Sequence, residues 1–190
     1  KEFDICREQQ IPHRLFARYG LDHVVPFNHE AMDDWRDSLR KGLMVRYDDS
    51  NIILSGGVDD IWFDNQTEEL IVVDYKSQAS NYEVNPSSYL SSPYHEAYKI
   101  QMDFYNYLLN LMGFKTGLIS YFLVVNADRH AEGFHGEMKF SETLVPYKHD
   151  FSWIDREVNN MIDCLNSDKL PESHISCENC AYARQRSSVE

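Results

Sequence analysis

Two aspartates and a lysine stand close together in the sequence, next to short apolar segments. Asp59 precedes the segment 61–63, and Asp74 follows the segment 70–73 with Lys76 two residues later. Carboxylate oxygens are the ligands that hard divalent cations such as Mg²⁺ prefer, and an ammonium group stabilises negative charge that develops on a phosphate. A cation held there would polarise a phosphate and lower the pKa of a water molecule. These residue types therefore indicate metal-assisted hydrolysis of a phosphodiester.

The two segments are predicted to form a β-hairpin that brings the aspartates together. A polar turn around 65–68 joins them, and a four-residue loop at this turn would place Asp59 opposite Asp74. Directly opposed side chains share a face of the sheet, with Cβ atoms roughly 4.5–5.5 Å apart. Two carboxylates at that separation repel one another unless a cation lies between them. The alternation of side chains along a strand puts Lys76 on the same face.

The same register predicts the surroundings of this pair. Gly57 would stand opposite Lys76, where a bare backbone leaves room for a phosphate or a water ligand. Alternation puts Asp60 on the opposite face, as a solvated acid or an acid one step removed from the metal. A simpler alternative is that Asp74 and Lys76 form an ordinary surface ion pair, because a single D-x-K sequence carries little information. Spacing alone leaves the metal site and the ion pair both open.

The elements that position these residues are helices and strands in mixed order. The hydrophobic pattern and the turn residues predict, in chain order, a helix over 27–42, strands over 43–47, 52–64 and 70–76, an exposed loop over 78–93, a helix over 94–112, strands over 118–125, 137–140 and 143–147, and a last helix from Ser152. This order predicts an α/β fold in which helices flank a mixed central β-sheet.

Composition supports one globular domain. The 190 residues are 43% hydrophobic and 26% charged, which is enough for an ordinary core. No apolar run approaches the roughly 20 residues that span a bilayer, so a membrane protein is excluded. The absence of an initial Met predicts that residues 1–190 are one domain lacking upstream residues. Four cysteines are too few for a disulfide scaffold of this size, which favours a reducing, cytoplasmic location.

Charge is evidence against a large nucleic-acid interface. The chain has 18 Lys and Arg against 31 Asp and Glu, a net charge of −13, whereas contacts to phosphates are made with Lys and Arg. Arg36, Arg40, Lys41 and Arg46 are expected to form a local basic patch. Grouped carboxylates in an acidic chain suit the capture of divalent cations.

Three motifs in order resemble the PD-(D/E)XK nuclease superfamily, and most closely its RecB-like branch. They are Gly-Gly-Val-Asp-Asp-Ile at 56–61, Val-Val-Asp-Tyr-Lys at 72–76 and Gln-Met-Asp-Phe-Tyr at 101–105. Each motif is weak alone, but their order and spacing are specific. The motifs cover Gly56 to Tyr105, and the order of the elements extends the similarity to most of the chain.

The resemblance implies a restriction-endonuclease-like core and a deoxyribonuclease that uses Mg²⁺ or Mn²⁺. Carried over by position, it makes Asp59, Asp74 and the backbone carbonyl of Tyr75 metal ligands and Lys76 the catalytic lysine. Gln101 and Tyr105 lie one helical turn apart and would support the active site and the bound strand. For Tyr105, a purely structural contact between helix and sheet is an equal alternative.

The sequence departs from the family pattern in one metal ligand. The family usually supplies a further acid or histidine from a helix before the hairpin. Glu2 and Asp4 are too near the chain start to assign, and His13, His23 and His29 lie in loop-like sequence. The ligand therefore either is one of these or lies upstream of Lys1.

The tail over 171–190 contains a C-x-x-C pair, Cys177 and Cys180. RecB-like relatives often hold an iron–sulfur cluster with cysteines on both sides of the nuclease core. The pair would be its downstream part, or part of a zinc site, in the full-length protein, although either site needs about four ligands. Cys164 falls near the inner stripe of the last helix and is predicted to be a buried thiol.

Two hypotheses from different classes follow. The first is a metal-dependent nuclease that hydrolyses DNA phosphodiester bonds through Asp59, Asp74 and Lys76, with single- and double-stranded DNA both open as substrates. The second is a nuclease-fold module that no longer cuts and binds nucleic acid or a protein partner in a larger complex. The acidic charge and the missing ligand favour the module, and the retained lysine and acids favour the enzyme.

Overall fold

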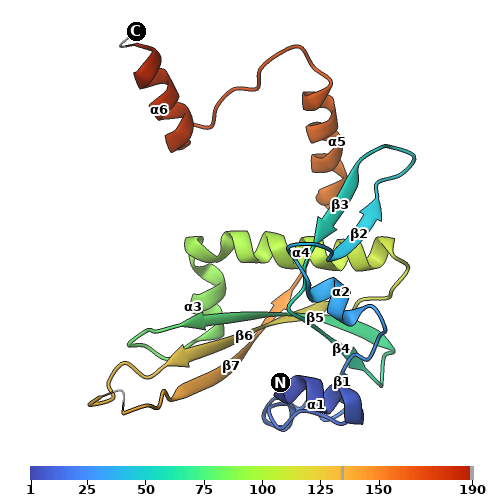
Figure 1. Ribbon diagram of the computed structural model, residues 1–190, viewed down its shortest axis with the longest axis vertical. Helices are drawn as coiled ribbons and strands as arrows, with labels where there is room; N and C mark the ends of the chain where they lie inside the picture. The colour runs from blue at the N-terminus through green and yellow to red at the C-terminus, as the bar shows by residue number, and fades with distance from the viewer. Residues whose placement is uncertain (134, 189–190) are drawn as a thin grey trace. The chain divides into compact units, whose positions relative to one another are not determined.

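A five-stranded mixed β-sheet forms the centre of the protein in the computed structural model, which describes residues 1–133 and 135–188 (Figure 1). The strand order is β1-β4-β5-β6-β7, with β5 and β6 parallel and the other neighbours antiparallel. A separate antiparallel hairpin, β2–β3, lies against α4. The predicted mixed α/β sheet flanked by helices is confirmed.

The strands are β1 (Val24–Pro26), β2 (Leu43–Arg46), β3 (Ile53–Gly56), β4 (Asp60–Asp64), β5 (Glu69–Gln78), β6 (Ile119–Ala127) and β7 (Phe140–Lys148). The α-helices are α1 (Glu2–Gln9), α2 (Met32–Arg36), α3 (Pro86–Ser91), α4 (Glu96–Leu111), α5 (Ile154–Leu165) and α6 (Glu178–Ser187), and short 3₁₀ helices are η1 (Phe16–Tyr19) and η2 (Pro93–His95).

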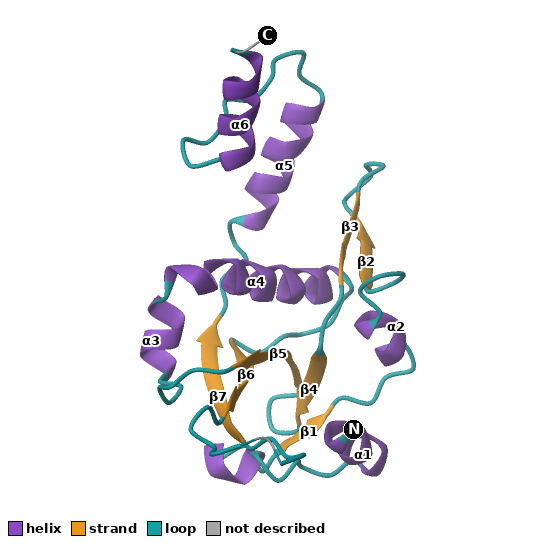
Figure 2. Ribbon diagram, turned by 60° about the vertical axis from the view of Figure 1, so that its left-hand side comes forward, coloured by secondary structure: helices purple, strands orange, loops and turns teal. Residues whose placement is uncertain are grey.

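The two faces of the sheet bury different side chains, because alternate residues of a strand point to opposite sides. α1 and the segment after it cover one face, where Phe16, Trp62 and Val73 belong to the apolar core and Phe3 of α1 stacks on Trp62. α4 crosses the other face, as Figures 1 and 2 both show. Leu108 of α4 is fully buried, as is Val72 of β5. The two faces therefore have separate cores.

The predicted strand over 52–64 is two strands in two different sheets. β3 pairs with β2, whereas β4 pairs with β1 and β5. The chain turns between them at Gly57, where an added Cβ would lie 2.3 Å from the Cβ of Ser38. The N–H of Val58 then donates to the carbonyl of Trp35. Only a glycine allows this close approach, so the break depends on a contact that is distant from the strand pattern.

Four other predicted elements differ from the structure. The helix over 27–42 is only α2, whose flanking Asp and Ser residues favour caps and turns over helix interiors. Leu39, predicted on its apolar stripe, is 94% exposed. The strands over 137–140 and 143–147 are the single strand β7, and the loop over 78–93 contains α3, which Asn85 caps by accepting two backbone N–H bonds.

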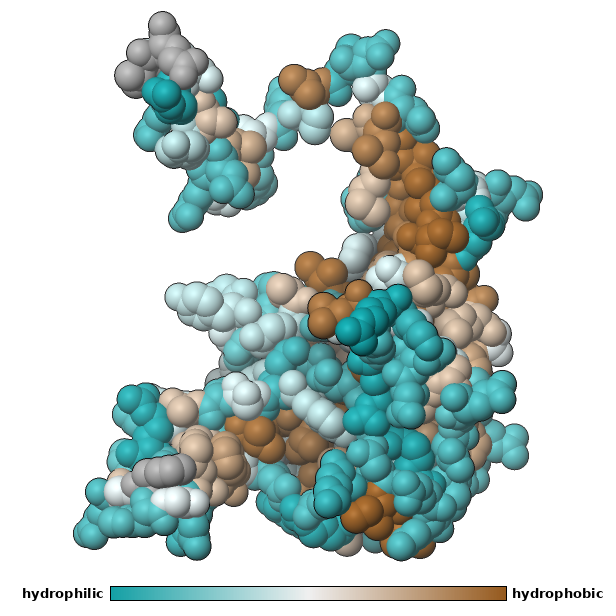
Figure 3. All heavy atoms as spheres, viewed as in Figure 1, coloured by the Kyte–Doolittle hydropathy of each residue, from teal (hydrophilic) through white to brown (hydrophobic). Residues whose placement is uncertain are grey.

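The chain divides into two compact units, Lys1–Phe151 and Ser152–Glu190, and the second contains α5 and α6. α5 is amphipathic: Ile154 and Val158 are buried, while Met161 and Leu165 on the same stripe are exposed. Figure 3 shows a brown, hydrophobic band over α5. Cys164 is exposed, so its prediction as a buried thiol is wrong. In the described part of the chain, no helix has the length and apolar character that crossing a bilayer requires.

Candidate active site

The β4–β5 hairpin has the predicted register. Asp64 pairs with Glu69, and the pairing continues residue by residue to Asp60 opposite Val73, which ends the ladder. Asp59 and Asp74 are the next pair in this register, at the point where β4 begins. The two carboxylates therefore stand at the open end of the hairpin, where the backbones no longer hydrogen-bond to each other as strands.

Side-chain contacts close this end of the hairpin. The Asp59 carboxylate accepts a 2.7 Å hydrogen bond from the backbone N–H of Tyr75, the residue after Asp74. Lys76 Nζ lies 2.5 Å from Oδ2 of Asp74, whose residue is only 2% exposed. Burial raises the pKa of the Asp74 carboxyl, Lys76 opposes this rise, and the nearby charge of Asp59 adds to it. The structure thus brings Asp59, Asp74 and Lys76 together on one face.

Helix α4 lies over this face and contributes three side chains. The Lys76 ammonium lies 4.3 Å from the centre of the Tyr98 ring, within the range of a cation–π contact. Gln101 Nε2 donates a 2.5 Å hydrogen bond to the Tyr105 hydroxyl, so the two residues share a face as predicted. Burial raises the pKa of Tyr105, and the charges of Asp74 and Asp59 raise it further. The Tyr105 hydroxyl is therefore close enough to both carboxylates to interact with them electrostatically.

Tyr98 was not among the residues singled out from the sequence. It lies three residues before Gln101 and seven before Tyr105, and this spacing places all three on one face of α4. The spacing was visible in the sequence. However, the aromatic residues of α4 are numerous, and only its position over β5 distinguishes Tyr98 from the others.

The comparison with protein families gives one match. The model of the PD-(D/E)XK nuclease superfamily matches residues 6–185, nearly the whole chain. The chain belongs to the PD-(D/E)XK nuclease superfamily. No curated protein and no solved structure matches it. The superfamily assignment made from the three motifs is confirmed, and the predicted core agrees with the mixed sheet.

The upstream residues considered as a further ligand of this PD-(D/E)XK site are all engaged elsewhere. Glu2 contacts His13 and Arg14, and Asp4 binds Arg7 and Arg36. His23 lies 3.5 Å from Asp64, and His29 stacks on Trp35. Across residues 1–133 and 135–188, no three His, Cys, Asp or Glu side chains are grouped closely enough to bind one metal ion.

The two aspartates nevertheless suit a hard divalent cation. Oδ2 of Asp74 is buried and receives no hydrogen bond of normal geometry from the described residues. The N–H and C=O of one strand residue point to the same side, so the Tyr75 carbonyl faces the same edge as the N–H that Asp59 binds. Mg²⁺ commonly binds through one or two carboxylates and keeps several waters. The oxygen donors present therefore fit this class of metal.

Two glycines in the first motif of this PD-(D/E)XK chain have packing roles. Gly56 lies under Tyr105, where an added Cβ would be 2.8 Å from ring carbon Cε1. Gly57 was expected to leave space for a phosphate opposite Lys76. Its free side is instead occupied by Ser38. Both glycines instead allow the β2–β3 hairpin and the site to approach neighbouring elements.

The C-x-x-C pair lies in the second unit. Cys177 is the N-cap of α6, and its sulfur accepts a 3.5 Å hydrogen bond from the N–H of Cys180. Hydrogen bonds from the backbone and from the Cys180 thiol lower the pKa of Cys177. Both thiols are free, as is Cys6 in the first unit. The pair supplies two of the about four ligands that a zinc or iron–sulfur site requires.

Proposed function

We propose that this protein is a metal-dependent nuclease that hydrolyses DNA phosphodiester bonds in the manner of the RecB-like branch, with Mg²⁺ or Mn²⁺ as its cofactor. Superfamily membership supports phosphodiester hydrolysis in general. The observation that supports activity in this chain is the contact of Lys76 with Asp74 beside Asp59. A structural ion pair alone would not explain why a second carboxylate stands next to a buried one.

Asp59, Asp74 and the Tyr75 carbonyl would hold the metal. When bound, a divalent cation supplies a Lewis acid for the phosphate and lowers the pKa of an attacking water. Asp59 is fixed in place because it accepts the N–H of Tyr75, and Asp74 is fixed by its burial. Ligands held in this way need little rearrangement to bind a cation, so less free energy is lost on binding.

Lys76 has the chemistry to stabilise charge on the phosphate. Its side chain is only 20% exposed, and its ammonium contacts both the Asp74 carboxylate and the Tyr98 ring and carries three donors. A positive charge in a partly buried site stabilises negative charge on a phosphate more strongly than the same charge does in water. Gln101 and Tyr105, joined by their hydrogen bond, form the wall of α4 beside the two carboxylates. We assign them to support of the site and the bound strand.

A catalytically inactive nuclease-fold module that binds nucleic acid or a protein is the second candidate. Two observations favour it: the net charge of −13 and the presence of only two acids at the site among the described residues. Binding of iron–sulfur or zinc through Cys177 and Cys180 stays a separate prediction for the full-length protein, checked by metal analysis of the purified chain.

The test is cleavage of single- and double-stranded DNA with Mg²⁺ or Mn²⁺. Lys76→Ala is expected to lower kcat by roughly 10²–10³, the range found when one preorganised charge-stabilising group is removed. Lys115→Ala is the matched control, because Lys115 pairs with Glu69 at the start of the same strand β5. Cleavage that Lys76→Ala leaves unchanged, or no cleavage by the full-length protein, would exclude the enzyme and favour the module.

A further inference from the structure

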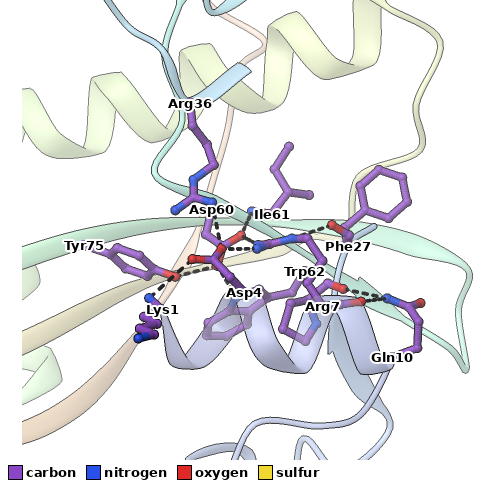
Figure 4. A network of polar contacts seen from close by, with 11 residues as sticks. Lys1, Asp4, Arg7, Gln10, Phe27, Arg36, Asp60, Ile61, Trp62 and Tyr75 are labelled. Carbon is purple, nitrogen blue, oxygen red and sulfur yellow. Dashed lines mark hydrogen bonds and ion pairs between the residues drawn. The ribbon is translucent and has the colours of Figure 1, made fainter. Parts of the chain in front are cut away.

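A second buried carboxylate lies on the opposite face of the same hairpin. Asp60 is 1% exposed, although it is adjacent to Asp59. Its Oδ2 accepts a 2.5 Å hydrogen bond from the hydroxyl of Tyr75, and its Oδ1 accepts hydrogen bonds from Arg7 of α1 and from the N–H of Ile61 (Figure 4). Asp60 is therefore fully engaged, and it is not a solvated acid.

The hydrogen bond between Tyr75 and Asp60 joins the two strands just beyond their last pair. The ladder between β4 and β5 ends at Asp60 and Val73, so backbone pairing does not hold Asp59 against Asp74. On the active-site face, Asp59 accepts the N–H of Tyr75. On the opposite face, the Tyr75 hydroxyl donates to Asp60. These two cross-links hold one residue, Tyr75, from both sides.

Helix α1 fixes the far side of this arrangement. Arg7 also donates from Nε to the carbonyl of Phe27 at 2.9 Å and from Nη1 to Asp4 at 2.6 Å. Asp4 in turn accepts a 2.9 Å hydrogen bond from Arg36 of α2. Figure 4 shows Arg7 and Arg36 converging on Asp4 and Asp60 from different elements. The carboxylate of Asp60 is thus held at a fixed point by groups outside the hairpin.

We propose that Asp60, together with Tyr75 and Arg7, is a positioning group for the metal site, and that it sets the separation of Asp59 and Asp74 from behind the sheet. This inference rests on the proposed function, because it assigns a role toward the cation that Asp59 and Asp74 would hold. Tyr75 lies between Asp74 and Lys76 in β5, so a rotation of this segment would move both residues.

Stability alone does not explain a buried ion pair at this point. Apolar residues of similar volume often replace such a pair without loss of stability, because burying two charges costs as much as their attraction gains. Apolar rings pack on this face of the hairpin: Phe3 contacts the rings of Trp62 and Tyr75, and the indole N–H of Trp62 donates to Oδ2 of Asp60 at 3.4 Å. A further aromatic or aliphatic side chain would suit that core, whereas only a polar group can hold the Tyr75 hydroxyl in one place.

The experiment compares Tyr75→Phe with Tyr19→Phe. Tyr75→Phe removes the bond to Asp60 and keeps the ring, which borders the same apolar core as Tyr19. Tyr19→Phe removes a hydroxyl that accepts the N–H of Leu144 at 3.0 Å, two strands across the sheet from Tyr75 and on the side away from Asp59. The first readout is the affinity for Mn²⁺ by calorimetry. The second is hydrogen exchange of the residue 75 amide without metal, corrected for global stability.

Tyr75→Phe is expected to weaken Mn²⁺ binding roughly fivefold, the equivalent of one net hydrogen bond, and to speed exchange of the residue 75 amide. Tyr19→Phe should leave both unchanged, even if both variants lose similar stability. Asp60→Asn, which keeps an acceptor for Tyr75, should fall between Tyr75→Phe and the unaltered protein.

Equal Mn²⁺ affinity and equal amide exchange in Tyr75→Phe and Tyr19→Phe would overturn the positioning role. Asp74→Asn separates this result from a failure of the proposed function. If Asp74→Asn abolishes Mn²⁺ binding while Tyr75→Phe does not affect it, the site exists and the positioning role is wrong. If the unaltered protein binds no Mn²⁺, or binds it equally in Asp74→Asn, the metal site itself is wrong.

Discussion

At the scale of single residues, Asp74 is held in an unfavourable state in the metal-free protein. Its carboxylate is almost completely buried, and the pKa is raised by that burial despite the ammonium of Lys76 at 2.5 Å. A raised pKa means that the ionised group costs the folded state free energy at neutral pH. Residues kept for function commonly reduce the stability of the folded protein. A cation bound to Asp74 would offset the free-energy cost of its buried charge.

Asp74→Asn is therefore expected to increase the stability of the metal-free protein while it removes Mn²⁺ binding. The expected gain is about 1 kcal/mol at pH 7 in EDTA, measured by urea unfolding. Asp64→Ala at the other end of β4 is the control, because it removes the oxygen that accepts the N–H groups of Gln66 and Thr67 and should destabilise the protein. A less stable Asp74→Asn would show that the ion pair with Lys76 outweighs the burial.

At the scale of elements, the site depends on the close approach of α4 to the end of β3. Gly56 is in contact with the ring of Tyr105, and Tyr105 holds the amide of Gln101. The hairpin β2–β3 and α4 therefore meet at one residue without a side chain. A change of Gly56 acts on the active site through the position of α4, although Gly56 touches no substrate.

Gly56→Ala is expected to destabilise the protein by about 1–3 kcal/mol, as other insertions into packed sites do, and to lower kcat more than KM. Its new Cβ would displace the Tyr105 ring, which is 2.8 Å away. Tyr105→Leu in the same chain should recover part of the stability, which a double-mutant cycle measures. Gly117→Ala is the matched control, since the nearest atom to its Cβ is Oε2 of the flexible Glu69 at 3.3 Å. If the effects of Gly56→Ala and Tyr105→Leu on stability are additive, the ring of Tyr105 is not the cause of the destabilisation.

At the scale of the whole molecule, two of the four positive charges that were expected to form a basic patch are paired with acids. Arg36 binds Asp4, Lys41 binds Asp34 at 2.6 Å, and Arg46 donates to the carbonyl of Ser50. The chain as a whole carries a net charge of −13. Under the proposed function, DNA binding is therefore expected to depend on the active site and the cation more than on a track of lysines and arginines.

The salt dependence of DNA binding should accordingly be shallow. With about three or fewer phosphates neutralised, the slope of log K against log salt is expected to be no steeper than roughly −3. It is measured by fluorescence anisotropy with Ca²⁺ in place of Mg²⁺, so that a cation is present while cleavage is suppressed. Lys115→Ala alters a lysine that is already paired with Glu69, so it should not change the slope. A slope near −6 would reveal a basic surface that these ion pairs do not suggest.

The sequence by itself determined the parts of the site that follow from local rules. The turn at 65–68 and the alternation along two short strands fixed the register that brings Asp59 to Asp74, and Lys76 followed from the same alternation. Helical spacing likewise placed Gln101 beside Tyr105. These relations depend on neighbours within one hairpin or one helix turn, so the pattern of residue types is sufficient to predict them.

Only the tertiary structure decided which elements meet. It broke the segment 52–64 at Gly57, because Ser38 approaches there, and it placed Tyr98 over Lys76. It also buried Asp60 against Arg7, which is 53 residues away in the sequence. Such contacts join residues whose separation along the chain is large, and no periodicity within a segment records them. The placement of Asp59, Asp74 and Lys76 was therefore predictable from local order, whereas the contacts of Asp60 behind the sheet were set by long-range packing.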